Sequence, residues 1–154
     1  MPELSTAPDS REGVLRRSYV VPAGVVIGVA LEVIGKLWDD SWHAHHGDLG
    51  SVAALFQAHF LIFAGAALVL AAAVAWVRRR PSRGLPVMVL LAGAVAQVVG
   101  LVWDSIRHVQ GEEAPPAHVL IFGGLAVGVV GLVWAVVSSG FPARGASASS
   151  PAGR

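Results

Sequence analysis

The stretch LEVIGKLWDDSWH (residues 31–43) ends a hydrophobic segment with acidic, aromatic and histidine side chains, and it returns as AQVVGLVWDSIRH (96–108). The offset between the two copies is 65 residues, and it aligns Glu32 with Gln97, Gly35 with Gly100, Trp38 with Trp103, Asp39 with Asp104, and His43 with His108. So many matches at one offset indicate an internal duplication.

A second block extends the duplication. AHFLIFAG (58–65) matches AHVLIFGG (117–124) at an offset of 59 residues, which aligns His59 with His118. The change of offset predicts that the loop between the two blocks is six residues longer in the first repeat.

The composition is typical of a membrane protein. Of the 154 residues, 55% are hydrophobic and 14% are charged, whereas a soluble domain carries about 25% charged residues. Cysteine is absent, which excludes disulfides and thiolate metal sites. Four apolar segments are long enough to span about 30 Å of hydrocarbon, and they lie at roughly 19–38, 56–77, 85–103 and 118–137. We therefore predict an all-α integral membrane protein.

The domain organisation follows from the duplication. Residues 1–18 and 139–154 are polar and are predicted to be disordered cytoplasmic tails, and residues 19–138 form the transmembrane domain. Repeat 1 covers about 19–77 and repeat 2 about 85–138. Each repeat is predicted to be a helical hairpin, and two parallel repeats share a pseudo-two-fold axis along the membrane normal. The predicted architecture is a four-helix bundle of tandem hairpins.

Basic residues predict the orientation. Nine of the eleven lysine and arginine residues precede the first segment, join the second to the third, or follow the fourth. We therefore predict a multi-pass protein of the bacterial cytoplasmic membrane. The positive-inside rule places both of its termini in the cytoplasm. All six histidines then lie in the outward-facing half: His43, His45, His46, His59, His108 and His118.

The duplicated polar residues form a candidate metal site. Asp39 and His43 are four residues apart, so they share a helix face and lie roughly 6 Å apart, and His59 begins the returning helix. The second repeat supplies the same set, so the predicted ligands are Asp39, His43, His59, Asp104, His108 and His118. Carboxylate and imidazole suit copper, iron, zinc or manganese. Two arrangements are open: one ion in each hairpin, or both sets converging on one mononuclear or dinuclear centre.

Other polar residues are assigned lesser roles. Glu32 and its aligned partner Gln97 are predicted to support the ligands or relay protons, although Lys36 one turn away offers a counter-ion to Glu32. His45 and His46 have no counterparts in the second repeat and are predicted to be peripheral, in an exposed loop. A polar network that holds the helices together without metal is the alternative interpretation of the whole set.

The ligand pattern resembles a known copper site. Asp-x-x-x-His on one membrane helix, with a further histidine opening the next, resembles a site in the C subunit of the particulate methane and ammonia monooxygenases. The matching residues are Asp39, His43 and His59, and again Asp104, His108 and His118, about twenty residues per repeat. The resemblance implies copper and does not extend to methane or ammonia oxidation. The repeated phrase also resembles a motif of small bacterial four-helix membrane proteins, which implies no particular activity.

Three functions are compatible with these residues. The first is a membrane metal-binding protein, with copper or iron favoured, that acts as an oxidoreductase on an apolar or quinone-like molecule from the lipid. The second is a b-type haem protein with His59 and His118 as axial ligands. The third is a metal or proton transporter or assembly factor, which the apolar inner halves of the spans disfavour. We expect the protein to lie in the lipid bilayer and to associate with a second copy of itself or with another membrane protein. We expect no nucleic-acid partner.

Overall fold

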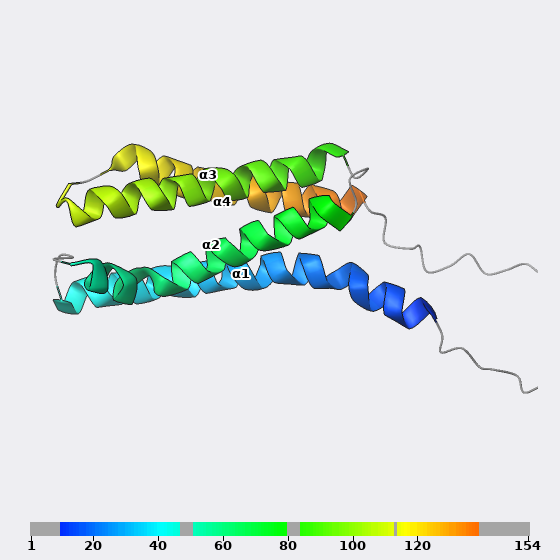
Figure 1. Ribbon diagram of the computed structural model, residues 1–154, viewed down its shortest axis with the longest axis horizontal. Coiled ribbons are helices and arrows are strands. Elements are labelled where there is room, and N and C mark those ends of the chain that lie inside the picture. The colour runs from blue at the N-terminus through cyan, green and yellow to red at the C-terminus, as the bar shows by residue number, and fades with distance from the viewer. Residues whose placement is uncertain (1–9, 47–50, 80–83, 113, 139–154) are drawn as a thin grey trace, which may run out of the picture.

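The computed structural model describes residues 10–46, 51–79, 84–112 and 114–138, and it is all-α. The four helices are α1 (Ser10–His46), α2 (Val52–Arg79), α3 (Gly84–Val109) and α4 (Pro115–Ser138) (Figure 1). Each contains a span of 24 to 28 residues that is long and apolar enough to cross a membrane, since about 20 residues suffice. The prediction of four membrane-spanning helices is thereby confirmed at the level of length and composition.

The helices pair as two hairpins, α1 with α2 and α3 with α4, and contacts between α2 and α3 join the hairpins. Figure 1 shows the two hairpins close together at the end where α2 finishes and farther apart at the opposite end. We call these the arginine end, after Arg78 and Arg79 in the last turn of α2, and the histidine end, after the last turn of α1.

Helix α1 is longer than the sequence predicts. It begins at Ser10, so residues 10–18, which were predicted to belong to a disordered tail, are helical. It also continues to His46, so that His45 and His46 lie in its last turn and not in a loop as predicted. Residues 1–9 and 139–154, the rest of the predicted tails, lie outside the described residues.

The additional residues of repeat 1 are helical and do not lengthen the loop. Five residues separate α1 from α2, and five separate α3 from α4. In repeat-aligned positions α1 ends two residues later than α3, and α2 begins four residues earlier than α4. The predicted longer loop is therefore wrong, because the chain extends both helices of the first hairpin by a total of six residues.

The number of helices that contribute to the apolar core changes from the arginine end to the histidine end. At the arginine end one cluster draws buried side chains from all four helices, including Val25, Val69, Leu90 and Leu132. A smaller cluster of Ile62, Ala66, Leu101 and Ile121 follows in the middle. At the histidine end the remaining cluster comes from the first hairpin alone: Leu55 and Ala58 with Trp42 and Ala54. The four-helix core thus stops short of the histidine end.

Glycines allow the two helices of each hairpin to touch. A Cβ placed on Gly28 would lie 2.8 Å from the Gly65 carbonyl oxygen, and one on Gly93 would lie 2.6 Å from that of Gly124. Both values are below 3.0 Å, a separation that real Cβ atoms essentially never show. The two contacts join aligned positions, so both hairpins are built on the same helix crossing.

Large hydrophobic side chains cover the outside of the four helices. They are exposed on every helix, for example Val26, Ile34, Phe60, Val102, Phe122 and Val130. A soluble protein rarely exposes so continuous an apolar surface, whereas lipid solvates it. The surface therefore supports the assignment of the helices to a membrane.

Candidate metal centre

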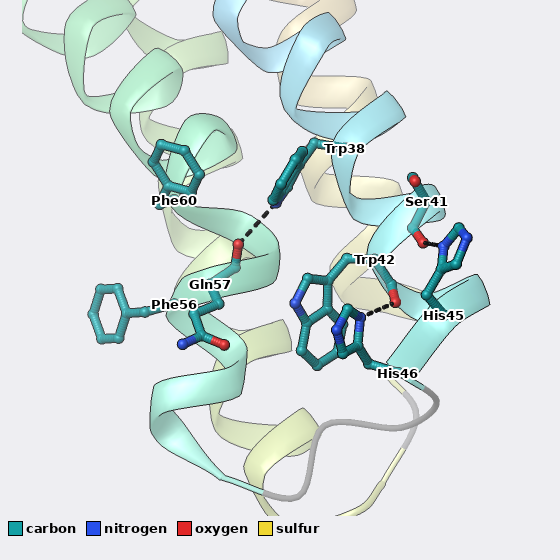
Figure 2. Close-up of a pocket in the computed structure, with 8 residues that line it drawn as sticks. All are labelled: Trp38, Ser41, Trp42, His45, His46, Phe56, Gln57 and Phe60. Atoms are coloured by element: carbon teal, nitrogen blue, oxygen red, sulfur yellow. Dashed lines mark hydrogen bonds between the residues drawn. The ribbon is translucent and has the colours of Figure 1, made fainter.

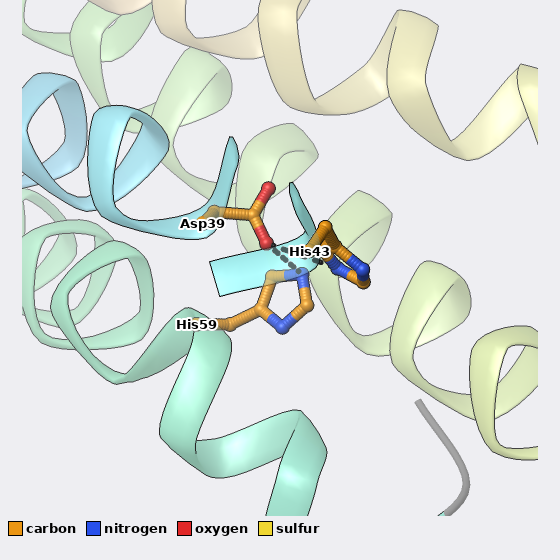
Figure 3. Close-up of side chains that lie close together, drawn as sticks. All are labelled: Asp39, His43 and His59. Atoms are coloured by element: carbon orange, nitrogen blue, oxygen red, sulfur yellow. Dashed lines mark ion pairs between the residues drawn. The ribbon is translucent and has the colours of Figure 1, made fainter. Parts of the chain in front are cut away.

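Asp39, His43 and His59 converge at the histidine end (Figure 3). Asp39 and His43 lie one turn apart on α1, and His59 faces them from α2. The Asp39 Oδ1 atom is 3.3 Å from His43 Nε2 and 3.2 Å from His59 Nε2. One ligand atom from each side chain lies within 4.8 Å of the other two, which makes this, over the described parts of the chain, the one group of acidic and histidine side chains arranged to hold a metal ion.

The orientation of His59 prepares its Nε2 atom for a cation. Its Nδ1 lies 3.0 Å from the carbonyl oxygen of Leu55. Because a carbonyl oxygen only accepts hydrogen bonds, we infer that Nδ1 carries the proton. In the neutral ring Nε2 then presents a lone pair to the Asp39 carboxylate, so two acceptors face each other across 3.2 Å. Metal-binding histidines commonly donate their second N–H to a carbonyl in this way.

Asp39 is buried but incompletely paired. It is 8% exposed, and its Oδ1 atom has no hydrogen-bond donor. Lys36 Nζ approaches the other oxygen, Oδ2, at 3.4 Å and forms a closer pair with Asp40. A buried carboxylate oxygen without a partner is costly. The two oxygens of the carboxylate thus face different groups: Oδ2 faces the lysine, and Oδ1 faces the two imidazoles.

The second set, Asp104, His108 and His118, has the same order but a looser geometry. Asp104 Oδ1 is 3.3 Å from His118 Nε2, and Asp104 Oδ2 is 3.5 Å from His108 Nδ1. The His118 side chain is 48% exposed, against 11% for its counterpart His59. The sequence predicted two equivalent ligand sets, and the structure makes them unequal.

Both sets line one cavity of about 630 Å³ between the hairpins. The ring of His108 lies 6.3 Å from the ring of His43 and 6.0 Å from that of His59, so the second set reaches the first. The structure thus places both sets around one shared cavity, which is compatible with one ion in each hairpin and with one common centre. Its wall is otherwise mainly apolar: Val33, Leu37, Ile62, Leu101, Ile121, Phe122 and Leu125.

Glu32 and Gln97 meet between the two hairpins. Gln97 Nε2 donates a hydrogen bond to Glu32 Oε2, and Gln97 and Glu32 are 1% and 5% exposed, respectively. Glu32 also lines the shared cavity, and its second oxygen Oε1 has no hydrogen-bond partner. Lys36 turns to Asp39 and Asp40 instead, so the interpretation of Lys36 as the counter-ion of Glu32 is not what the structure shows.

His45 and His46 belong to a different pocket (Figure 2). Their Nδ1 atoms lie 2.6 and 3.0 Å from the carbonyl oxygens of Ser41 and Trp42. This pocket of about 590 Å³ is lined by Trp38, Ser41, Trp42, His45, His46, Phe56, Gln57 and Phe60. The two histidines are therefore peripheral to the shared cavity.

The aromatic pocket itself was missed from the sequence. Its tryptophans and its phenylalanines each repeat at a spacing of four residues, Trp38 with Trp42 and Phe56 with Phe60. That spacing places each pair on one helix face. It was the sequence feature from which an aromatic pocket could have been predicted.

Comparison with protein-family models, curated proteins and solved structures finds no match to this chain. The likeness to the monooxygenase C subunit accordingly rests on the six ligand positions. Any function of the chain must therefore be inferred from the arrangement of those side chains.

Proposed function

We propose that this chain is an integral membrane protein that binds a transition-metal ion through Asp39, His43 and His59. One observation carries the proposal: a buried carboxylate oxygen without a hydrogen bond lies between two imidazole nitrogens. A cation between these atoms resolves the contact between acceptors. Three protein ligands also leave coordination positions open, as in catalytic metal sites.

Copper and iron are the favoured metals. Imidazole and carboxylate accept both, as well as zinc and manganese, and two histidines with one carboxylate form the ligand set of many iron(II) oxygenases. Copper(II) binds most tightly to nitrogen and oxygen ligands among the divalent first-row ions. The resemblance to the monooxygenase copper site supports the same choice.

The shared cavity supports an oxidoreductase that acts on a small apolar or quinone-like molecule. Apolar side chains such as Leu37, Ile121 and Phe122 line it together with the proposed ligands. A redox-active ion with an open position would then meet a substrate that partitions into lipid. With the positive-inside orientation, the site faces the outside of the cytoplasmic membrane, and the two hairpins are related by a pseudo-two-fold axis.

The alternative functions have weaker support. A haem held by His59 and His118 needs both Nε2 atoms to face one iron, but each lies against the aspartate of its own hairpin. A transport path must cross the arginine end, where a core shared by all four helices, with Leu90 and Val25 almost fully buried, fills the interior.

Metal analysis of detergent-purified protein tests the proposal. The apo protein is offered copper(II), iron(II), zinc(II) and manganese(II) in turn, and bound metal is measured after desalting. Asp39→Ala and His59→Ala should lose the tightly bound ion, whereas His45→Ala, which removes a histidine of the same helix end outside the cavity, should keep it. Equal metal content in all three variants would overturn the proposal. Circular dichroism confirms that each variant remains helical.

A further inference from the structure

We infer that Asp104, His108 and His118 hold a second metal ion, so that the shared cavity contains a two-metal centre assembled from both hairpins. The inference rests on the proposed function of the first set. It adds that the centre holds two metal ions and that the two ions bind with different affinities.

The first support is the charge of Asp104. It is 9% exposed, and its Oδ1 atom has no hydrogen-bond donor. Leu101 stands at the position aligned with Lys36, so the lysine that accompanies Asp39 has no counterpart. Arg107, the nearest cation along α3, is paired with Glu112 instead. A buried carboxylate at membrane depth requires a cation, and the second set supplies none except a histidine proton or a bound ion.

The second support is the position of His108. Its Nδ1 atom is buried, has no hydrogen-bond partner and lies 3.5 Å from Asp104 Oδ2. His118 Nε2 approaches the other oxygen of the same carboxylate at 3.3 Å. A carboxylate flanked by two imidazole nitrogens thus occurs a second time, on helices of the other hairpin.

The position of the His108 ring joins the two sets. It lies about as far from the rings of the first set, 6.3 Å from His43 and 6.0 Å from His59, as those two rings lie from each other, 6.0 Å. Two ions held by these sets would therefore interact magnetically and would face the same cavity. The six side chains would hold both ions against one cavity, where the ions could act together on a single bound molecule.

The two ions should bind with different affinities. The first set is already gathered, with one atom of each ligand within 4.8 Å of the others. In the second set the His118 side chain lies beside Asp104 but is half exposed, so it loses more side-chain freedom when it binds an ion. We expect at least a tenfold difference in dissociation constant, with the first set filling first.

Titration of the apo protein with copper(II) tests the two-metal centre. Wild-type protein should bind two ions in two steps, and the fully loaded protein should show dipolar broadening in its paramagnetic-resonance spectrum. Asp104→Asn and His118→Ala should each bind one ion, with the affinity of the first step retained and the broadening lost. The asparagine variant keeps the shape of the aspartate, so loss of folding does not explain its result.

The outcomes separate this inference from the proposed function. One ion per wild-type chain, lost in Asp39→Ala and unaffected by Asp104→Asn, would overturn the second site and leave the first intact. Two ions retained in Asp104→Asn and His118→Ala would also overturn it. A wild-type chain that binds no ion would remove the proposed function, and the second site with it.

Discussion

The two hairpins carry the same ligand order in different settings. In the first, the His59 side chain is 11% exposed and its Nδ1 is held by the Leu55 carbonyl. In the second, the His118 side chain is 48% exposed. The difference follows from the helix ends, because α2 begins at Val52, whereas α4 begins at Pro115, four aligned positions later.

The additional turn of α2 accounts for the better-formed first set. It contains Leu55, which is buried with Ala58 against Trp42 and supplies the carbonyl that orients His59. Ala114, which is aligned with Leu55, precedes α4, and its carbonyl accepts a backbone hydrogen bond from the His118 amide. A duplication thus repeats the ligands, while the flanking helical turn decides how firmly each ligand is held.

The largest expected effect concerns what the hairpins share. Leucine at Gly65 or at Gly124 would force apart a helix contact with no room for a Cβ. We expect each variant to lower the free energy of unfolding in detergent by about 3 kcal/mol, the upper end of overpacking costs. Gly123→Leu is the control, because nothing lies within 4 Å of a Cβ there. A large loss in one hairpin and none in the other would show that the two crossings are not equivalent.

The next effect concerns the buried hydrogen bond between Glu32 and Gln97, which occupy aligned positions of the two repeats but are different residues. Gln97→Glu sets a second carboxylate against Glu32 in a buried site. We expect a loss of about 2 kcal/mol in unfolding free energy, since a buried acceptor loses its donor. The double exchange Glu32→Gln with Gln97→Glu restores the donor and should recover most of the loss. Failure of the exchange to recover stability would mean that the two positions are not interchangeable.

Much of this architecture was predictable from sequence. Hydropathy located the four helices. Helical periodicity placed Asp39 with His43, and Asp104 with His108, on one helix face, and the hairpin of each repeat returned His59 or His118 beside that face. These features depend on local pattern and are therefore readable without coordinates.

The features that were not predictable depend on packing at the helix ends. Six residues assigned to a loop prolong α1 and α2. The residues added to α2 include Leu55, whose buried position no local pattern specifies. The choice of Lys36 between Glu32 and Asp40 depends on a rotamer. The unequal ligand sets follow from the helix ends, so the duplication alone suggested a symmetry that the side chains do not keep.

A third prediction distinguishes a metal site from a structural network. Asp39→Asn replaces an acceptor that faces the His59 lone pair with an amide that can donate to it. The metal-free protein should therefore gain about 1 kcal/mol of unfolding free energy, the value of one hydrogen bond, while its affinity for the first ion falls. Asp40→Asn, at the exposed neighbouring position, should change neither. A network that serves stability alone predicts the opposite sign, a loss of stability in Asp39→Asn.

The smallest effect tests the charge difference between the sets. Lys36→Leu installs the residue that the second repeat carries, Leu101, and it removes a cation that lies 3.4 Å from Asp39 Oδ2. Because a positive charge weakens the attraction of the carboxylate for a metal ion, the variant should bind the first ion about threefold more tightly, consistent with exposed pairs worth about 0.2–1 kcal/mol. The reverse change, Leu101→Lys, should weaken the second ion by a similar factor. Copper titration at two salt concentrations checks both, since screening should shrink the Lys36→Leu effect. An effect of Lys36→Leu that is independent of salt would assign it to packing and not to charge. A salt-dependent effect would mean that the first set binds its ion more tightly despite the lysine beside Asp39, because the additional turn of α2 orients His59.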